Sequence, residues 1–284
     1  MRTIIRQRSI FNHLADIEAN EHNMIGIREL TYRIGKKELL HNLSFEVKSG
    51  ELLAVLGANG AGKSTLMKLL CREINPTSGQ IYLRGCDLQS YKLPELAKQR
   101  AVLSQQNTIS ISFLVHELVM MGRYPHFDQY PAEADVVIVK QVMVETGITH
   151  LSGRDYNTLS GGEQQRVQLA RVLAQIYDCK DACLFLDEPT NGLDLRYQQQ
   201  VMELARSLAD RGYCVICILH DINFASRFAD KILMLKEGRK VAMGTPVEVI
   251  NCENIHETFS INVKLMPCEG YSCPLVIPAT SNIN

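Results

Sequence analysis

The sequence lacks any long apolar run. No stretch approaches the roughly 18 to 20 consecutive apolar residues that a helix needs to span a bilayer. Arginines interrupt the apolar residues of the first segment, MRTIIRQRSIF, too often for the apolar core of a secretory signal peptide. We therefore expect a soluble chain that reaches any membrane only through a partner.

The sequence also lacks an excess of charge of either sign. The formal net charge is −1, and no block of like charges occurs. Proteins that bind nucleic acid usually carry a clustered basic surface, which this pattern excludes. We expect an evenly charged surface and no nucleic-acid partner.

Cysteine, in contrast, is plentiful. There are nine cysteines, an odd number, and most stand in apolar runs such as CVICIL and DACLFL. This usage favours reduced thiols that pack as small apolar side chains. Cys214 and Cys217 form a CxxC pair, for which a zinc or redox role is the alternative. Alternation along a buried strand explains the pair better. Cys268 and Cys273 fall in a tail that looks loop-like.

The pattern of segments predicts one α/β domain with a subdomain. Residues 1–23 are polar and weakly periodic, and we expect them to lie outside the fold. Strand-like segments follow from Met24, and strands alternate with helices again after residue 165. Between about 86 and 165 the segments look helical (PELAKQRAV, VHELVMMG, AEADVVIVKQVMVETG). Apolar strands alternating with helices predict a mainly parallel sheet covered on both faces.

The segment GANGAGKST matches the phosphate-binding pattern GxxxxGK[ST]. It follows the apolar strand ELLAVL and opens a helix, which is the context that the pattern requires. Its glycines allow backbone N–H groups to surround phosphates, while Lys63 reaches the β- and γ-phosphates and the Ser64 hydroxyl ligates Mg²⁺. A merely tight glycine turn would not need the Lys–Ser pair. The predicted ATP-binding residues are Gly57, Ala58, Asn59, Gly60, Ala61, Gly62, Lys63, Ser64 and Thr65.

Two carboxylates end a second apolar strand, ACLFL. Ligands of open α/β sheets bind at the carboxyl ends of strands. We expect Asp187 to hold Mg²⁺ through its water shell, and Glu188 to orient and deprotonate the attacking water. A helix-capping acidic pair is the alternative. His220 ends a third apolar strand, where we expect it to contact the γ-phosphate rather than to be merely structural.

The segment LSGGEQ introduces the amphipathic helix QRVQLARVLAQIY. Ser160 followed by Glu163 predicts a capping box, but a capping box does not explain Gly161 and Gly162. Two glycines at a helix N-terminus make a second anion-binding surface. Two such surfaces in one chain could act in trans, through head-to-tail pairing of two copies.

Taken together, LSGGEQ, GANGAGKST and LFLDEPTNGLD resemble the nucleotide-binding domain of ABC transporters over residues 24–263. The resemblance implies a P-loop NTPase fold with an antiparallel β subdomain, an inserted helical subdomain and a tail at 264–284. It also implies adenine stacking by Tyr32 and Mg²⁺ sensing by Gln105 or its neighbour Gln106. Asp194 would cross a dimer interface, and His220 would be a switch histidine. Taken one at a time, each of these residues could instead be an ordinary core or surface residue with no role in the site.

A narrower resemblance lies in MGRYPHF and in RDYNTLSGGEQQRVQLARVLAQIY. These segments resemble the ATPases of bacterial haem (hemin) importers, within the group that also serves ferric siderophores and cobalamin. Asn191-Gly192 departs from the Ser-Ala expected there. The resemblance implies an ATPase homodimer with ATP and Mg²⁺ on the cytoplasmic side of the inner membrane. Its partners would be permease subunits and, indirectly, a substrate-binding protein.

The segment after Gln105 is where the family docks its permease. Its apolar residues could partly line that groove, with several of them serving instead as helical core: Phe113, Leu114, Val115, Met120, Met121, Tyr124 and Phe127. A translation or repair ATPase would carry two nucleotide domains or a long coiled coil, and an exporter would normally carry membrane helices. A phosphate-loop kinase or GTPase would not need LSGGEQ. An importer ATPase is the function that the sequence favours.

Overall fold

The computed structural model describes residues 23–104, 111–270 and 272–279. The predictions for residues 1–22, for Gln105 and Gln106, and for the last five residues lie outside the described residues. The core is a six-stranded sheet in the order β10-β9-β3-β8-β7-β6, in which only the β9–β10 pair is antiparallel. Its strands are β3 (Leu52–Leu56), β6 (Arg100–Leu103), β7 (Cys183–Asp187), β8 (Cys214–Ile218), β9 (Lys231–Lys236) and β10 (Arg239–Gly244). The mainly parallel core sheet is therefore confirmed.

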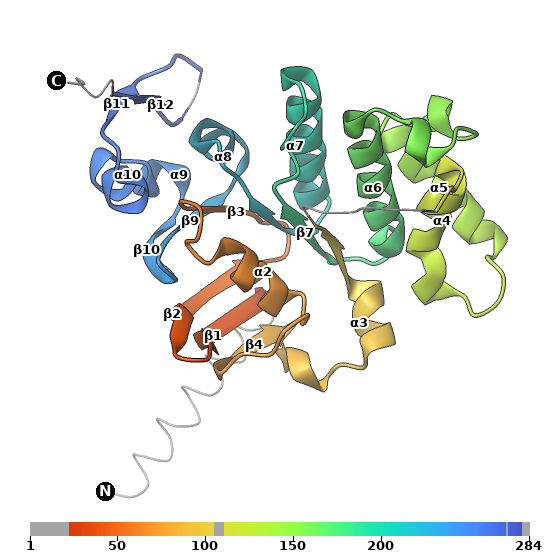
Figure 1. The fold of residues 1–284 in the computed structure, drawn as a ribbon, viewed down its shortest axis with the longest axis horizontal. Coiled ribbons are helices and arrows are strands. Elements are labelled where there is room, and N and C mark those ends of the chain that lie inside the picture. Colours follow the sequence, from red (N-terminus) through yellow and green to blue (C-terminus); the bar gives the residue numbers. More distant parts are fainter. Residues whose placement is uncertain (1–22, 105–110, 271, 280–284) are drawn as a thin grey trace, which may run out of the picture.

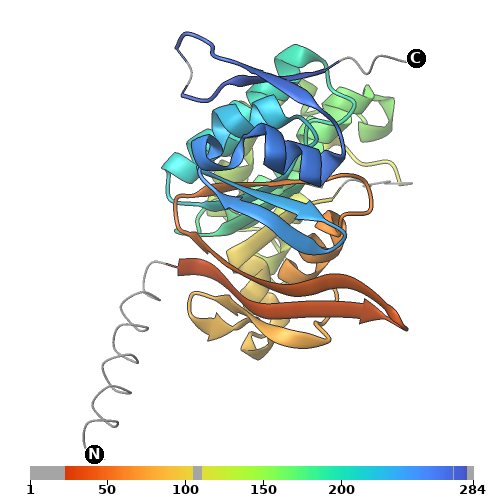
Figure 2. The same cartoon turned by 90° about the vertical axis from the view of Figure 1, so that its left-hand side faces the viewer.

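A second, antiparallel sheet lies beside this core in the order β2-β1-β4-β5. It consists of β1 (Asn23–Ile34), β2 (Lys37–Lys48), β4 (Ser78–Leu83) and β5 (Cys86–Asp87). Figure 2 shows it as a separate layer below the core sheet. The antiparallel β subdomain expected from the resemblance is present.

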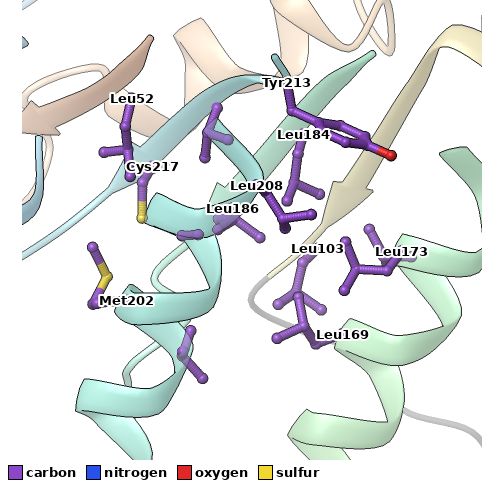
Figure 3. Close-up of a cluster of buried hydrophobic side chains, with 14 of the residues drawn as sticks. Leu52, Leu103, Leu169, Leu173, Leu184, Leu186, Met202, Leu208, Tyr213 and Cys217 are labelled. Atoms are coloured by element: carbon purple, nitrogen blue, oxygen red, sulfur yellow. The ribbon is translucent and has the colours of Figure 1, made fainter. Parts of the chain in front are cut away.

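Helices cover both faces of the core sheet (Figure 1). Helix α2 (Lys63–Leu70) packs between the two sheets, while α6 (Gly161–Ile176), α7 (Leu195–Asp210) and α8 (Ile222–Phe228) cover the opposite face. Successive strand residues therefore enter different cores. Leu53 and Val55 of β3 pack with α2, whereas Leu52 and Ala54 pack with α6 and α7. Figure 3 shows part of this second core, with leucines of α6 and α7 against the strands.

The same alternation explains the CxxC pair. Cys214 points into the core shared with α2, and Cys217 points into the core on the other face. Two thiols on opposite faces of one strand cannot bind one metal ion or pair with each other. Burial raises the pKa of the Cys217 thiol, so this side chain stays protonated as an apolar group.

The segment from 86 to 165 is mostly helical, apart from the short strand β5 at its start and the strand β6 within it. The helix predicted over PELAKQRAV ends at Gln99, and the next four residues form β6, the edge strand of the core sheet. Ala101 and Leu103 are buried while their neighbours are half-buried, a period of two that favours a strand. The helices of this segment are η1 (Leu88–Ser90), α3 (Leu93–Gln99), α4 (Val115–Met120), η2 (Met121–His126), α5 (Glu133–Glu145), η3 (Thr149–Leu151) and η4 (Tyr156–Thr158).

The C-terminal tail also differs from the loop that its sequence suggests. After α9 (Pro246–Val249) and α10 (Cys252–Phe259), a hairpin forms from β11 (Val263–Met266) and β12 (Leu275–Pro278). The Asn223 side chain of α8 holds this hairpin, since it accepts the Val276 N–H at 2.9 Å and donates to the Val276 carbonyl at 3.2 Å. Among the described residues, no helix has the length and apolarity to cross a membrane.

Candidate active site

Three strands of the core sheet end side by side. Ile218 of β8 is in register with Val55 of β3 on one side and with Asp187 of β7 on the other. Because the strands are parallel, the residues that follow them leave the sheet at one edge. Gly57, Glu188 and His220 therefore meet there, as the sequence predicted.

The phosphate loop leaves β3 at Gly57 and enters α2 at Lys63. A Cβ atom on Gly57 would lie 2.4 Å from the Leu235 carbonyl oxygen, so only glycine fits there. Gly62 precedes the helix with a φ of 100°, a conformation that favours glycine. Ala58, Asn59, Gly60 and Ser64 are exposed, so the loop is open to a ligand.

Lys63 lies under this loop and is buried. Its Nζ donates to the carbonyls of Gly57 and Ala58, at 2.7 and 3.1 Å. Burial lowers the pKa of the Lys63 ammonium, while the nearby charges of Glu188 and Asp187 act in the opposite direction. The ammonium group is thus positioned inside the loop, between its carbonyls and the acidic pair.

The side chains of Glu188 and His220 are in direct contact. Glu188 Oε1 lies 2.6 Å from His220 Nε2, and the Glu188 N–H donates to the Ile218 carbonyl of β8 at 3.2 Å. The Glu188 backbone has a φ of 52°, a left-handed conformation that costs a non-glycine residue about 1 kcal/mol. Strain of this kind is frequent at functional sites. Here it turns the chain sharply after β7 and places the carboxylate beside the imidazole.

Asp187 is the last residue of β7 and faces the phosphate loop. Its Oδ1 atom is buried and accepts no hydrogen bond from any residue that the structure describes. Burial, and then the charge of Glu188, raise the pKa of this carboxyl above its ordinary value. A buried carboxylate oxygen without a partner fits a bound cation, and oxygen ligands suit magnesium.

The segment LSGGEQ forms the predicted capping box at the start of α6. The Ser160 N–H donates to Glu163 Oε2 at 2.8 Å, and Ser160 Oγ accepts the Glu163 N–H at 3.4 Å. Nothing crowds Gly161, since a Cβ atom there would meet no atom within 4 Å. Because α2 and α6 pack on opposite faces of the core sheet, this exposed helix end stands apart from the phosphate loop of its own chain.

The remaining predicted residues lie around this site. Tyr32 of β1 pairs with Leu40 of β2, and the Leu40 side chain covers Gly62. Asp194 is exposed and caps α7, accepting the Tyr197 N–H at 3.0 Å. Sequence reasoning missed Gln165, whose Nε2 donates to the Pro189 carbonyl at 2.6 Å. The repeated glutamines after LSGGE are the only signal for it, and they do not reveal a partner 24 positions away.

Comparison with known proteins agrees with this geometry. The family model described as ABC transporter matches residues 40–191, more than half of the chain. The hemin import ATP-binding protein HmuV of Gloeobacter violaceus is 44% identical, covering 88% of this chain and 92% of its own. HmuV of Pseudomonas entomophila is 40% identical, covering 89% and 99%.

Solved structures show the same architecture. A metal-chelate type ABC transporter in an inward-facing conformation has a TM-score of 0.78 and 27% identity, covering 91% of this chain and 98% of its own. The cbiO1 protein of Clostridium perfringens, part of the complex cbiONQ, has a TM-score of 0.71 and 28% identity over 84% of this chain and 97% of its own. With sequence, fold and site in agreement, the chain belongs to the ABC transporter family as an ATP-binding, ATP-hydrolysing subunit.

Proposed function

We propose that this subunit powers the import of haem, working as a head-to-tail homodimer bound to a permease on the cytoplasmic face of the inner membrane. One observation carries the choice of haem. Five relatives named hemin import ATP-binding protein are 37–44% identical to this chain, and each alignment spans 88–91% of it.

Within the site, Glu188 acts as general base for the water that attacks the γ-phosphorus. The His220 imidazole, at 2.6 Å, holds the carboxylate in place. Lys63 and the N–H groups of the phosphate loop stabilise the negative charge on the γ-phosphoryl oxygens. The attacking water loses its proton to Glu188, and the bond from the γ-phosphorus to the bridging oxygen of ADP breaks.

Asp187 and Ser64 are the residues that would hold magnesium. The unpartnered Oδ1 of Asp187 and the exposed Ser64 at the start of α2 support this assignment. When bound, the ion neutralises charge on the β- and γ-phosphates. The tests of this pair are the loss of magnesium-dependent ATP affinity in Asp187→Asn and in Ser64→Ala.

The two-chain arrangement follows from where the two anion-binding surfaces lie. Ser160 and Gly161 stand at a helix end on the face of the sheet opposite α2. A second copy, turned head to tail, brings this end to the phosphate loop of the first. Asp194 and the exposed Leu195 then face the partner copy.

The apolar residues after position 110 fall into two groups, one packed in or against the core and one available to the permease. Val115 is buried in the core, and Phe113, Met120 and Met121 pack against it. Leu114 and Tyr124 are exposed, and the Tyr124 ring meets the half-buried Phe127 edge to face, with centroids 5.7 Å apart. We assign the docking surface to Leu114, Tyr124 and Phe127. Arg123 of the MGRYPHF segment is buried and belongs to the scaffold.

Reconstitution with the native permease in vesicles tests the cargo. The binding protein is loaded with haem, a ferric siderophore or cobalamin, and both ATP hydrolysis and uptake are measured. We expect stimulation and uptake with haem only, and neither with the Glu188→Gln subunit in matched vesicles. A solved relative of metal-chelate type makes a metal chelate the second candidate. Uptake of the siderophore or cobalamin without haem would replace the cargo and leave the ATPase assignment unchanged.

A further inference from the structure

The start of α6 and the loop after Glu188 are joined by a hydrogen bond that neither anion-binding surface requires. The Gln165 side chain reaches out of the second turn of α6 and donates to the Pro189 carbonyl at 2.6 Å. Gln165 is half-buried and Pro189 is buried, so this bond is partly shielded from water. Shielded hydrogen bonds hold their geometry more strictly than exposed ones.

The hydrogen bond to the Pro189 carbonyl fixes the backbone directly after Glu188. Proline has no N–H, so this carbonyl is the only backbone hydrogen-bonding group that residue 189 offers. On the other side, the Glu188 N–H is fixed to the Ile218 carbonyl of β8. The backbone around Glu188 is therefore held by the sheet, by Gln165 and by the Asn191 N–H, which donates to the Glu188 carbonyl at 3.1 Å.

Further contacts join the first turns of α6 to this loop and to α7. The Arg166 guanidinium carbon lies 4.0 Å from the centre of the Tyr197 ring on α7. Leu193 Cδ2 lies 3.3 Å from the point where a Cβ on Gly162 would stand. On the far side, Gln198 Nε2 donates to the Leu193 carbonyl at 2.9 Å. The loop from 189 to 194 is thus held between α6 and α7.

We infer that Gln165 is a positioning residue that ties the orientation of Glu188 to α6, the helix that Ser160 caps. The consequence rests on the proposed homodimer. There, Ser160 contacts the ATP held by the partner copy, while Glu188 serves the ATP held by its own chain. When Ser160 binds the ATP held by the partner copy, Gln165 then affects the position of Glu188, the catalytic base for the ATP held by its own chain.

Gln165→Glu tests this role, because it keeps the shape of the side chain and removes the donor. We expect kcat to fall about tenfold or more, since small displacements of a catalytic group are costly. We expect the KM for ATP to stay within about twofold, because the phosphate loop is unchanged. Gln165→Lys restores a donor and should recover a large part of kcat. If the carboxylate prevents folding, Gln165→Ala takes its place.

Gln175→Ala is the matched control, since Gln175 on the same helix donates to the carbonyls of Ala97 and Arg100, away from the site. It should lower stability and leave kcat within about twofold. In a Glu188→Gln background, Gln165→Glu should cause no further loss of residual turnover. Equal fold losses in both backgrounds, or a normal kcat in Gln165→Glu, would overturn the inference. Normal turnover by Glu188→Gln itself would instead remove Glu188 from the proposed mechanism.

Discussion

At the scale of single residues, the site depends on charges whose environments differ. Lys63 is buried under the phosphate loop, and Asp187 is half-buried beside it. Burial lowers the pKa of Lys63 and raises the pKa of Asp187, and both shifts favour the neutral form of the group. A bound nucleotide with a cation supplies charges of both signs to this point.

Glu188→Gln is the most direct test at this scale. The amide keeps the size of the side chain and cannot accept the proton of the attacking water. We expect ATP binding to persist and turnover to fall about 10²-fold or more. Equilibrium binding of a fluorescent ATP analogue and steady-state phosphate release measure the two effects. Near-normal hydrolysis would remove Glu188 from the mechanism.

At the scale of elements, a buried ion cluster fixes the helical segment to the core. Arg123 of η2 bonds Asp135 of α5 through Nε at 2.8 Å. Its two terminal nitrogens meet the carboxylate of Asp178, just beyond α6, at 2.8 and 3.0 Å. A fourth bond reaches the Ala174 carbonyl of α6. One side chain therefore holds three elements together, next to the surface assigned to the permease.

Removing Arg123 should be costly. Arg123→Leu leaves the Asp135 carboxylate buried without its cation, and we expect a loss of about 3 kcal/mol in the free energy of unfolding. Adding Asp135→Asn should restore part of this loss, because the unpaired charge disappears. Urea titration followed by circular dichroism measures both. Equal stability of the single and double variants would contradict this account.

The ion pair between Arg123 and the half-exposed Asp178 predicts that the stability of the fold depends on pH. The side-chain hydrogen bonds from Arg123 lower the pKa of Asp178 below its ordinary value near 3.8. A depressed pKa in the folded state stabilises the fold above the ordinary value, and this contribution is lost as the pH falls through the folded-state pKa. Asp178→Asn should therefore cost about 1 kcal/mol at pH 7, a small value because the side chain is half exposed, and progressively less as the pH falls below 3.8. A loss that is constant with pH would contradict the ion pair as its cause.

At the scale of the whole molecule, we propose that the catalytic unit is a pair of chains. A mixture of Lys63→Ala and Ser160→Arg chains forms dimers in which one composite site carries both mutations and the other carries none. We expect each variant alone to be inactive and the mixture to recover turnover, measured as phosphate release against mixing ratio. Each variant mixed with itself at the same total concentration is the control. An inactive mixture at every ratio would contradict a composite site that can act alone.

The sequence by itself determined the features that depend on local pattern and backbone chemistry. GANGAGKST predicted the phosphate loop because Gly57 and Gly62 stand where a Cβ would clash or the backbone is left-handed. Ser160 and Glu163 predicted the capping box, and apolar runs predicted the parallel strands. Strand ends of a parallel sheet share an edge, so the meeting of Gly57, Glu188 and His220 was also within reach of the sequence.

Only the tertiary structure decided the features that depend on distant partners. The strand at Arg100–Leu103 exists because β7 pairs with it, although the preceding residues continue a helical pattern. The hairpin of the tail is fixed by Asn223 of α8, and Gln165 meets Pro189 across 24 positions. The burial of Arg123 among η2, α5 and α6 also depends on how these elements pack together. Side-chain hydrogen bonds and burial depend on which elements pack together, and the local periodicity of the sequence does not predict that packing.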